Sequence, residues 1–173
     1  MRPLRKLESE TELYDAAIRA LMRRAHSVHE MRKSLERRAA SKEMVKSVLE
    51  RLKRQNLLDD AKYAQQFTRQ RIQIRRQGKF RIARDLRTRG VPDRHIEAAL
   101  EAAGTPEDET ALVRKRIERK LKALGGVIDQ RKIASLYGSL LRLGFPSEII
   151  RREIRAMTRE EVPEISDSSE ESA

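Results

Sequence analysis

Three stretches of this chain place apolar or small residues at the same spacing. In each stretch the offsets from the first residue are 0, 4, 10 and 14, and the start points lie 51 and then 54 residues apart. Offsets of four predict helices with one buried face, and a long regular period is typical of tandem helical units. The pattern therefore predicts one helical unit used three times. The expected buried positions are Leu35, Ala39, Val45 and Leu49; Leu86, Gly90, Ile96 and Leu100; and Leu140, Gly144, Ile150 and Ile154.

Capping signals divide the first repeat into three helices. A first helix is predicted over about residues 12–24, where apolar residues recur on one face. Ser27 and Glu30 form a Ser-x-x-Glu capping box that starts a second helix. Ser41 is the expected N-cap of a third helix.

The second repeat has its own start and stop signals. The aspartate pair at 59–60 is expected to begin its first helix, and Gly78 interrupts that helix. Gly90 is expected to end the next helix, and Pro92 to lie in the first turn of the last one.

The third repeat begins with another capping signal and has the same Gly and Pro spacing as the second. Thr105 and Asp108 predict a helix start, and the Gly125–Gly126 pair predicts its end. Gly144 and Pro146 repeat the spacing of the Gly and Pro in the second repeat. The predicted divisions are an N-terminal segment with repeat 1 over 1–57, repeat 2 over 58–104, repeat 3 over 105–158, and an acidic tail over 159–173 that we expect to be disordered.

The composition favours an all-α fold. Charged residues make up 38% of the chain and aromatic residues 3%, with 7 Gly and 5 Pro to form turns. An apolar content of 38% predicts thin helical stripes rather than one thick core. We therefore expect three tandem three-helix, helix-turn-helix-like repeats in an elongated, curved array. The chain has no Cys and no segment near the roughly 18 apolar residues of a membrane span, so we expect a cytoplasmic protein without membrane contact.

Positive charge is concentrated in one stretch. The formal net charge is +12, and residues 69–89 hold nine basic residues against one acid, a net +8. Like charges repel one another unless a polyanion neutralises them, so this stretch predicts binding to DNA or to an acidic protein surface. The residues expected to make these contacts are Arg69, Arg71, Arg75, Arg76, Lys79, Arg81, Arg84 and Arg87.

Two other charged stretches are less specific. Basic residues over 23–54 alternate with glutamates, and a solvated helical face explains this stretch equally well. Residues 160–173 hold six acids and no Lys or Arg, and the chain without them carries 39 basic and 21 acidic residues. Such a tail either competes with polyanions for a basic surface or only improves solubility.

No group of residues predicts catalysis, a cofactor or a metal site. His26 and His29 are three residues apart, but His29 falls inside the capping box and no third ligand is near in sequence. The chain has neither a Gly-x-x-x-x-Gly-Lys loop, which cradles nucleotide phosphates, nor a Gly-x-Gly-x-x-Gly turn, which binds dinucleotides. Tyr63 and Phe67 have the spacing of a core stripe, which we favour over a base-stacking surface. Phe80 lies within the basic stretch and is the better stacking candidate.

Three motifs together resemble the bacterial RecX regulatory proteins. The resemblance covers roughly residues 13–157, and the usual Glu-Leu of the first repeat reads Glu30-Met31 here. The motifs are Arg24-Ala25-His26-Ser27-Val28-His29-Glu30-Met31-Arg32-Lys33-Ser34-Leu35; Leu52 followed by Asn56-Leu57-Leu58-Asp59-Asp60-Ala61-Lys62-Tyr63-Ala64; and Gly78 to Leu86 with Gly90-Val91.

The resemblance implies a non-enzymatic regulator of the RecA recombinase. It implies three tandem three-helix repeats that bind the RecA filament on single-stranded DNA. Members of this family typically bind in the filament groove and limit strand exchange, ATP hydrolysis and co-protease action. A role in recombinational repair and the SOS response follows, for a protein that we expect to be a monomer.

Two other functions remain open from the residues alone. One is a free-standing DNA-binding regulator of the helix-turn-helix type, although Asp93 and Glu97 would repel phosphate at the start of its recognition helix. The other is a scaffold that binds only acidic proteins. Salt dependence of binding to naked single strands separates these two, because phosphate contacts give a steep slope.

Overall fold

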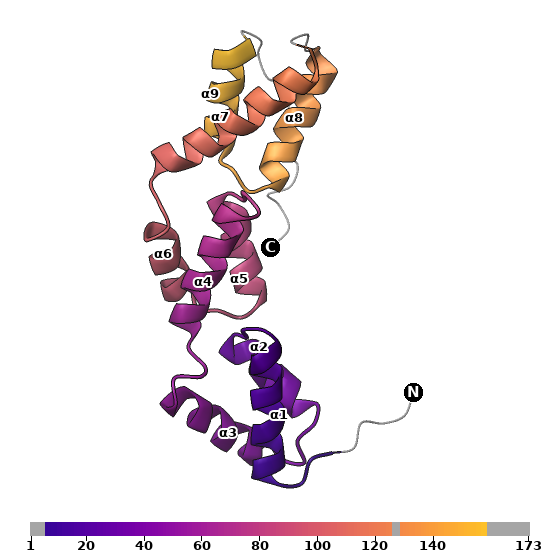
Figure 1. Cartoon of the computed structure of the whole chain (residues 1–173), viewed down its shortest axis with the longest axis vertical. Helices are drawn as coiled ribbons and strands as arrows, with labels where there is room; N and C mark the ends of the chain where they lie inside the picture. The colour runs from indigo at the N-terminus through magenta and orange to yellow at the C-terminus, as the bar shows by residue number, and fades with distance from the viewer. Residues whose placement is uncertain (1–5, 126–128, 159–173) are drawn as a thin grey trace, which may run out of the picture. The chain divides into compact units, whose positions relative to one another are not determined.

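The computed structural model describes residues 6–125 and 129–158, and this part of the chain is helical without a strand. Three successive groups of three helices follow the order of the repeats (Figure 1), which confirms the predicted all-α class and three-helix units. The acidic tail and Gly126 lie outside the described residues. The helices are α1 (Glu10–Arg23), α2 (Val28–Glu36), α3 (Lys42–Arg54), α4 (Asp60–Gln73), α5 (Lys79–Thr88), α6 (Asp93–Glu101), α7 (Pro106–Ala123), α8 (Gln130–Arg142) and α9 (Ser147–Thr158).

Side-chain caps begin several helices where the sequence predicts them. The Ser27 hydroxyl accepts from the backbone N–H of Glu30, whose carboxylate accepts from the N–H of Ser27 in return. Thr105 and Asp108 form the same box at α7, and Ser41 caps α3. These contacts pair N–H groups that a helix start otherwise leaves without a partner.

The two aspartates at the start of α4 accept hydrogen bonds from different helices, and the proline before α6 differs from expectation. Asp59 Oδ1 accepts from two backbone N–H groups of the first turn of α4, at 2.9 and 3.1 Å. Asp60 Oδ1 instead accepts from the N–H of Val28 at the start of α2, at 2.8 Å. Pro92 is the N-cap of α6 rather than a residue of its first turn, because its ψ of 140° is extended.

The described helices form two compact units. The first unit contains α1, α2, α3 and α6, with residues 60–70 of α4 and 83–88 of α5. The second contains α7, α8 and α9, with residues 71–82. The repeat boundaries at 57, 104 and 158 stay a prediction.

A core cluster of the first unit is enclosed mainly by α1, α2 and α3. Each Leu or Val fully buried in this way contributes roughly 1.5–3 kcal/mol. The four positions predicted from the first repeat are all buried. The cluster includes Leu13, Ala17, Met31, Leu35, Ala39, Val45, Val48, Leu49, Leu52 and Leu58.

The core of the second unit lies between α7, α8 and α9. All four positions predicted from the third repeat are buried, and Gly144 is among them. The side chains of this core are Val113, Ile117, Ile133, Leu136, Tyr137, Leu140, Phe145, Ile150 and Ile154.

The second repeat departs from its predicted pattern at two positions. Gly90 is exposed and Leu100 is only half-buried, so the expectation that both are buried is wrong. Gly90 has a φ of +70°, and an added Cβ would overlap the side chain of His29. Glycine at this repeat position therefore serves a left-handed turn with a close neighbour, and not burial of the residue.

The turn between α4 and α5 is held by a backbone contact within the second unit. The N–H of Gly78 donates to the carbonyl of Leu143 at 2.8 Å, and the N–H of Phe80 donates to that of Gly144 at 3.2 Å. A Cβ on Gly78 would overlap the carbonyl of Gly144, whose own φ is +86°. Glycine at both positions thus allows this close approach.

Candidate functional site

The eight cations predicted as contacts divide between the two units. Three belong to the first unit, and five belong to the second. The first group is Arg69, Arg84 and Arg87, and the second is Arg71, Arg75, Arg76, Lys79 and Arg81.

The first group lies on the exposed surface of α4 and α5. Arg69 and Arg84 are exposed. Arg87 Nε lies 2.7 Å from Asp93 Oδ1, and both side chains are more than half exposed. An exposed pair of this kind stabilises a fold by only about 0–1 kcal/mol, so the pair can open to admit another anion.

Lys79 and Arg81, of the second group, donate hydrogen bonds to backbone carbonyls of the protein. Lys79 Nζ donates to the carbonyl of Gly104 at 2.7 Å, and its backbone N–H donates to Glu109 at 3.0 Å. A guanidinium N–H of Arg81 donates to the carbonyl of Arg142 at 2.8 Å. These half-buried side chains position the α4–α5 turn. Their predicted contacts with a binding partner stay a prediction.

Arg75 and Arg76 are exposed on that turn and lie near cations of α7. The Arg116 guanidinium donates to the carbonyl of Arg75 at 3.3 Å. Partial burial lowers the pKa of Arg116, and the charges of Arg119 and Arg76 lower it further. The fold therefore gathers like charges here that are distant in sequence, at a cost in electrostatic repulsion.

Arg116 and Arg119 also line a pocket between α7 and α8 that sequence reasoning missed. Its volume is about 400 Å³, and leucine side chains of α8 form part of its wall. The cations at 116, 119 and 120 are three and four residues apart, so they share one face of α7. This spacing is the feature of the sequence that could have indicated the pocket. The polar residues of the pocket are Arg116, Arg119, Lys120, Ser135, Ser139 and Arg142.

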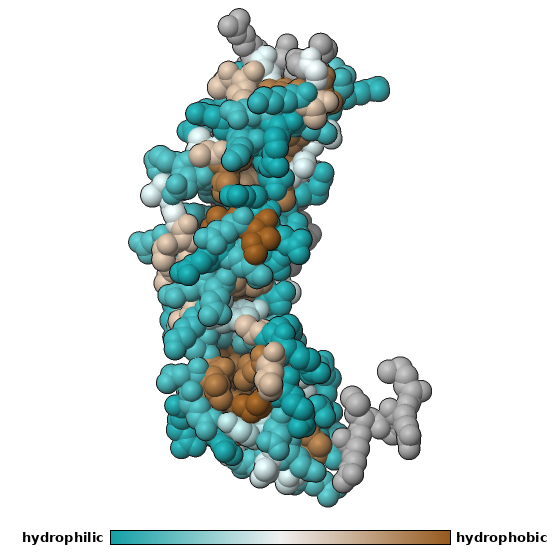
Figure 2. Space-filling view, viewed as in Figure 1, coloured by the Kyte–Doolittle hydropathy of each residue, from teal (hydrophilic) through white to brown (hydrophobic). Residues whose placement is uncertain are grey.

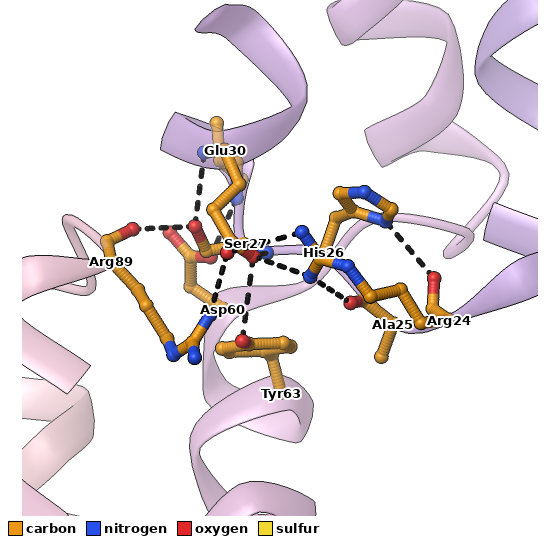
Figure 3. Close-up of polar contacts among 9 residues, drawn as sticks. Arg24, Ala25, His26, Ser27, Glu30, Asp60, Tyr63 and Arg89 are labelled. Carbon is orange, nitrogen blue, oxygen red and sulfur yellow. Dashed lines mark hydrogen bonds and ion pairs between the residues drawn. The ribbon is translucent and has the colours of Figure 1, made fainter. Parts of the chain in front are cut away.

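A second polar centre, in the first unit, surrounds Glu30 (Figure 3). Its carboxylate lies 3.1 Å from Arg24 and 2.7 Å from Arg89, and it accepts from the Tyr63 hydroxyl at 3.4 Å. The Ser27 hydroxyl donates to the carbonyl of Arg89. Burial raises the pKa of Glu30, but hydrogen bonds from Arg24 and Ser27 and the charges of both arginines outweigh it and lower the pKa below 4.5.

The aromatic residues of the second repeat fall into two classes. Tyr63 and Phe67 are 8% and 9% exposed, which confirms their predicted place in a core stripe. Both line a pocket of about 590 Å³ with Arg24 and Arg89, and the Arg89 guanidinium lies 5.1 Å from the centre of the Phe67 ring. Phe80 is 65% exposed, so its ring is accessible, and its role in stacking stays a prediction.

The described residues hold neither a candidate metal cluster nor a helix suited to a membrane. Nowhere in 6–125 or 129–158 do three His, Asp or Glu side chains gather in a way that could hold a metal ion. In the same residues, no helix has the length and apolarity to cross a bilayer. Figure 2 shows that hydrophilic side chains cover most of the visible face, with apolar patches between them.

The sequence and the fold both match known proteins. The family model of the first three-helix domain of RecX matches residues 14–52, and that of the second matches residues 59–100. A regulatory protein RecX from Halorhodospira halophila is 39% identical over 79% of this chain and 83% of its own length. One from Chlorobaculum tepidum is 33% identical over 85% of this chain and 89% of its own length.

Solved structures support the fold independently. The crystal structure of RecX from Lactobacillus salivarius matches with a TM-score of 0.76 at 20% identity, over 87% of this chain and 97% of that one. Another crystal structure of a regulatory protein RecX matches with a TM-score of 0.71 at 24% identity, over 88% of this chain and 72% of that one. At such identities these structures establish the fold, while the sequence matches establish the kinship. The chain therefore belongs to the RecX family of regulatory proteins.

Proposed function

We propose that this chain regulates RecA by binding RecA filaments on single-stranded DNA and restraining ATP hydrolysis, strand exchange and co-protease action. Membership of a regulatory family supports a role in control rather than in catalysis. The motifs that resemble RecX proteins supply RecA as the partner. The proposal places the protein in recombinational repair and the SOS response.

The exposed arginines of the α4–α5 turn are the observation that carries this proposal furthest. Arg75 and Arg76 are exposed beside Arg116, on a turn that backbone contacts at Gly78 hold in place. Guanidinium groups pair in a bidentate way with phosphates and carboxylates, so DNA and an acidic protein surface both suit them. A ligand shifts an assembly equilibrium only if it binds one state better, so the chain would act by preferring one filament state.

The geometry favours this function over a free-standing helix-turn-helix regulator. The helix after the Gly90-Val91-Pro92 turn is α6, and it begins with Asp93, whose side chain is 61% exposed. Glu97, one turn later, is also exposed. Carboxylates at the start of a recognition helix repel the phosphates that flank a groove.

Co-sedimentation with RecA filaments tests the proposal. Filaments are formed on single-stranded DNA with a slowly hydrolysed ATP analogue, and the chain is added with Arg75→Gln/Arg76→Gln and Lys42→Gln/Lys46→Gln as matched variants. Each variant loses two exposed positive charges, but the lysines lie on α3, in the first unit, whereas the two arginines belong to the second. The parent and the lysine variant should sediment with filaments, and the arginine variant should bind about tenfold more weakly.

Two results would count against the proposal. Failure of the parent to sediment with filaments would remove RecA regulation by filament binding. Equal weakening of both variants would mean that overall charge, and not the α4–α5 turn, sets the affinity.

A further inference from the structure

The pocket between α7 and α8 has the chemistry of an anion site. Four cations and two hydroxyl groups line it, and no carboxylate is among its lining residues. Within the described residues, none of the four cations forms a salt bridge with Asp or Glu. The positive residues are Arg116, Arg119, Lys120 and Arg142, and the hydroxyl groups are those of Ser135 and Ser139.

Arg116 has a buried hydrogen-bond donor without an acceptor in the described part of the chain, and it lies among other cations. Its Nε is buried and has no hydrogen-bond partner among the described residues. Its pKa is lowered by partial burial and by the charges of Arg119 and Arg76. A buried donor without an acceptor costs about 1–3 kcal/mol, and crowded cations add repulsion. An anion in the pocket would offset the repulsion among these cations.

The α4–α5 turn adds a feature that favours nucleic acid over other anions. Arg142 lines the pocket, and two residues later the carbonyl of Gly144 accepts from the N–H of Phe80. Phe80 is 65% exposed and Ile74 is 69% exposed at the two ends of the same turn. An exposed aromatic side chain on a segment bonded to a cationic site suits single strands, because unpaired bases stack on the ring while the backbone follows the charges.

We infer that the α7–α8 pocket binds the phosphodiester backbone of single-stranded DNA, with bases directed to the α4–α5 turn. Arg119 and Lys120 contact phosphate oxygens from α7, and Arg142 does so from α8. Ser135 and Ser139 donate hydrogen bonds without adding charge, which lets the site hold a phosphate in one orientation. This inference rests on the proposed function, and it assigns part of the DNA contact to the third repeat, outside the arginine-rich stretch.

Salt-dependent binding to a fluorescent oligothymidylate tests this site in the full chain. The test variant is Arg119→Gln/Lys120→Gln, and the matched control is Lys115→Gln/Lys122→Gln, which removes two exposed charges of α7 that do not line the pocket. Each phosphate contact to a single strand contributes about 0.7 to the slope of log affinity against log salt. The test variant should lose about 1.4 from that slope, or about 25-fold in affinity at 0.1 M relative to 1 M salt. The control should keep the parent slope.

Three outcomes would overturn the inference. Equal slopes for parent and test variant would mean that the pocket makes no phosphate contact. An equal loss in test and control variants would mean that only net charge matters. Unchanged oligothymidylate binding with lost binding of polyglutamate in the test variant would assign the pocket to an acidic protein. Thermal unfolding of all variants verifies that each is folded.

The filament assay separates this inference from the proposed function. If the parent sediments with RecA filaments while the pocket variant keeps its salt slope, the inference fails and the proposed function stands. If the salt slope of the pocket variant falls but the parent never sediments with filaments, the pocket binds single-stranded DNA and the proposed RecA function fails.

Discussion

At the scale of single residues, Gly78 takes part in a close backbone contact of the second unit. Its Cα lies so close to Gly144 that an added Cβ would overlap the carbonyl of that residue. Gly78→Ala should therefore lower the free energy of unfolding by about 1–3 kcal/mol, as overpacking of a rigid contact does. Urea unfolding followed by circular dichroism measures the change.

Gly138→Ala is the matched control for that substitution. Gly138 lies within α8, and its Cβ would meet only the flexible end of Arg142 at 3.3 Å. Alanine should raise the free energy of unfolding by about 0.5–1 kcal/mol, because glycine is a poor helix former. Equal effects of the two substitutions would contradict the backbone contact at Gly78.

Glu30 should make the first unit sensitive to acid. Because its pKa in the folded state is held below 4.5, the stabilisation is present above that pH and is lost as the pH falls through the lower folded pKa. Glu30→Gln should cost about 1–2 kcal/mol at neutral pH, because the partners at Arg24 and Arg89 lose their counter-charge. Below the folded pKa of Glu30, the free energies of unfolding of the variant and the parent should converge.

Thermal unfolding from pH 7 to pH 3 measures this dependence. The gap in melting temperature between the parent and Glu30→Gln should narrow as the pH falls. A gap that stays constant would mean that the carboxylate charge does not stabilise the first unit.

At the scale of elements, the chain that follows α4 holds an arginine in a strained backbone conformation. Arg76 has a φ of +52°, and the N–H of Gln77 closes the helix end by donating to the carbonyl of Arg71 at 3.2 Å. A left-handed position of this kind favours glycine. The chain instead keeps a cation there, next to Arg75 and near Arg116.

Arg76→Gly should therefore stabilise the fold and weaken binding. We expect a gain of about 1 kcal/mol in the free energy of unfolding and a weaker affinity for single-stranded DNA. Arg76→Ala should weaken binding similarly without the gain in stability, because alanine shares the backbone cost. Urea titration and oligothymidylate binding measure the two effects, and a destabilised glycine variant would contradict the assignment of strain.

The sequence predicted the elements well where their signals are local. Ser27, Ser41 and Thr105 cap the helices that they were expected to start, because a cap depends on residues within one turn. Burial of Gly90 was predicted wrongly, since a glycine in a repeated position can serve either packing or a left-handed turn. Helical periodicity alone does not distinguish these two uses.

The candidate site was less predictable because it depends on tertiary contacts. Lys79 and Arg81 look the same as Arg75 and Arg76 in the sequence, but the fold turns the first two toward backbone carbonyls. Arg116 is some forty residues further on, and only the folded chain brings it to the carbonyl of Arg75. Charge density located the basic stretch but not the pocket between α7 and α8.

At the scale of the whole molecule, charge balance should control association with DNA. Residues 160–173 carry six acids and no Lys or Arg, so their removal raises the net charge from +12 to +18. Long-range attraction to a polyanion grows with net positive charge and is screened by salt. The truncated chain should associate faster with oligothymidylate at low salt, and stopped-flow fluorescence should show this advantage shrink above about 0.5 M salt. An equal rate for both chains at low salt would contradict it.

The proposed action of the whole chain is to restrain RecA on single-stranded DNA through exposed arginines. DNA-dependent ATP hydrolysis by RecA, measured as the chain is titrated, tests this most directly. We expect inhibition by the parent and by Lys42→Gln/Lys46→Gln at or below stoichiometric levels. Arg75→Gln/Arg76→Gln should need about tenfold more protein for the same inhibition. Unchanged hydrolysis in the presence of the parent would contradict the proposed action.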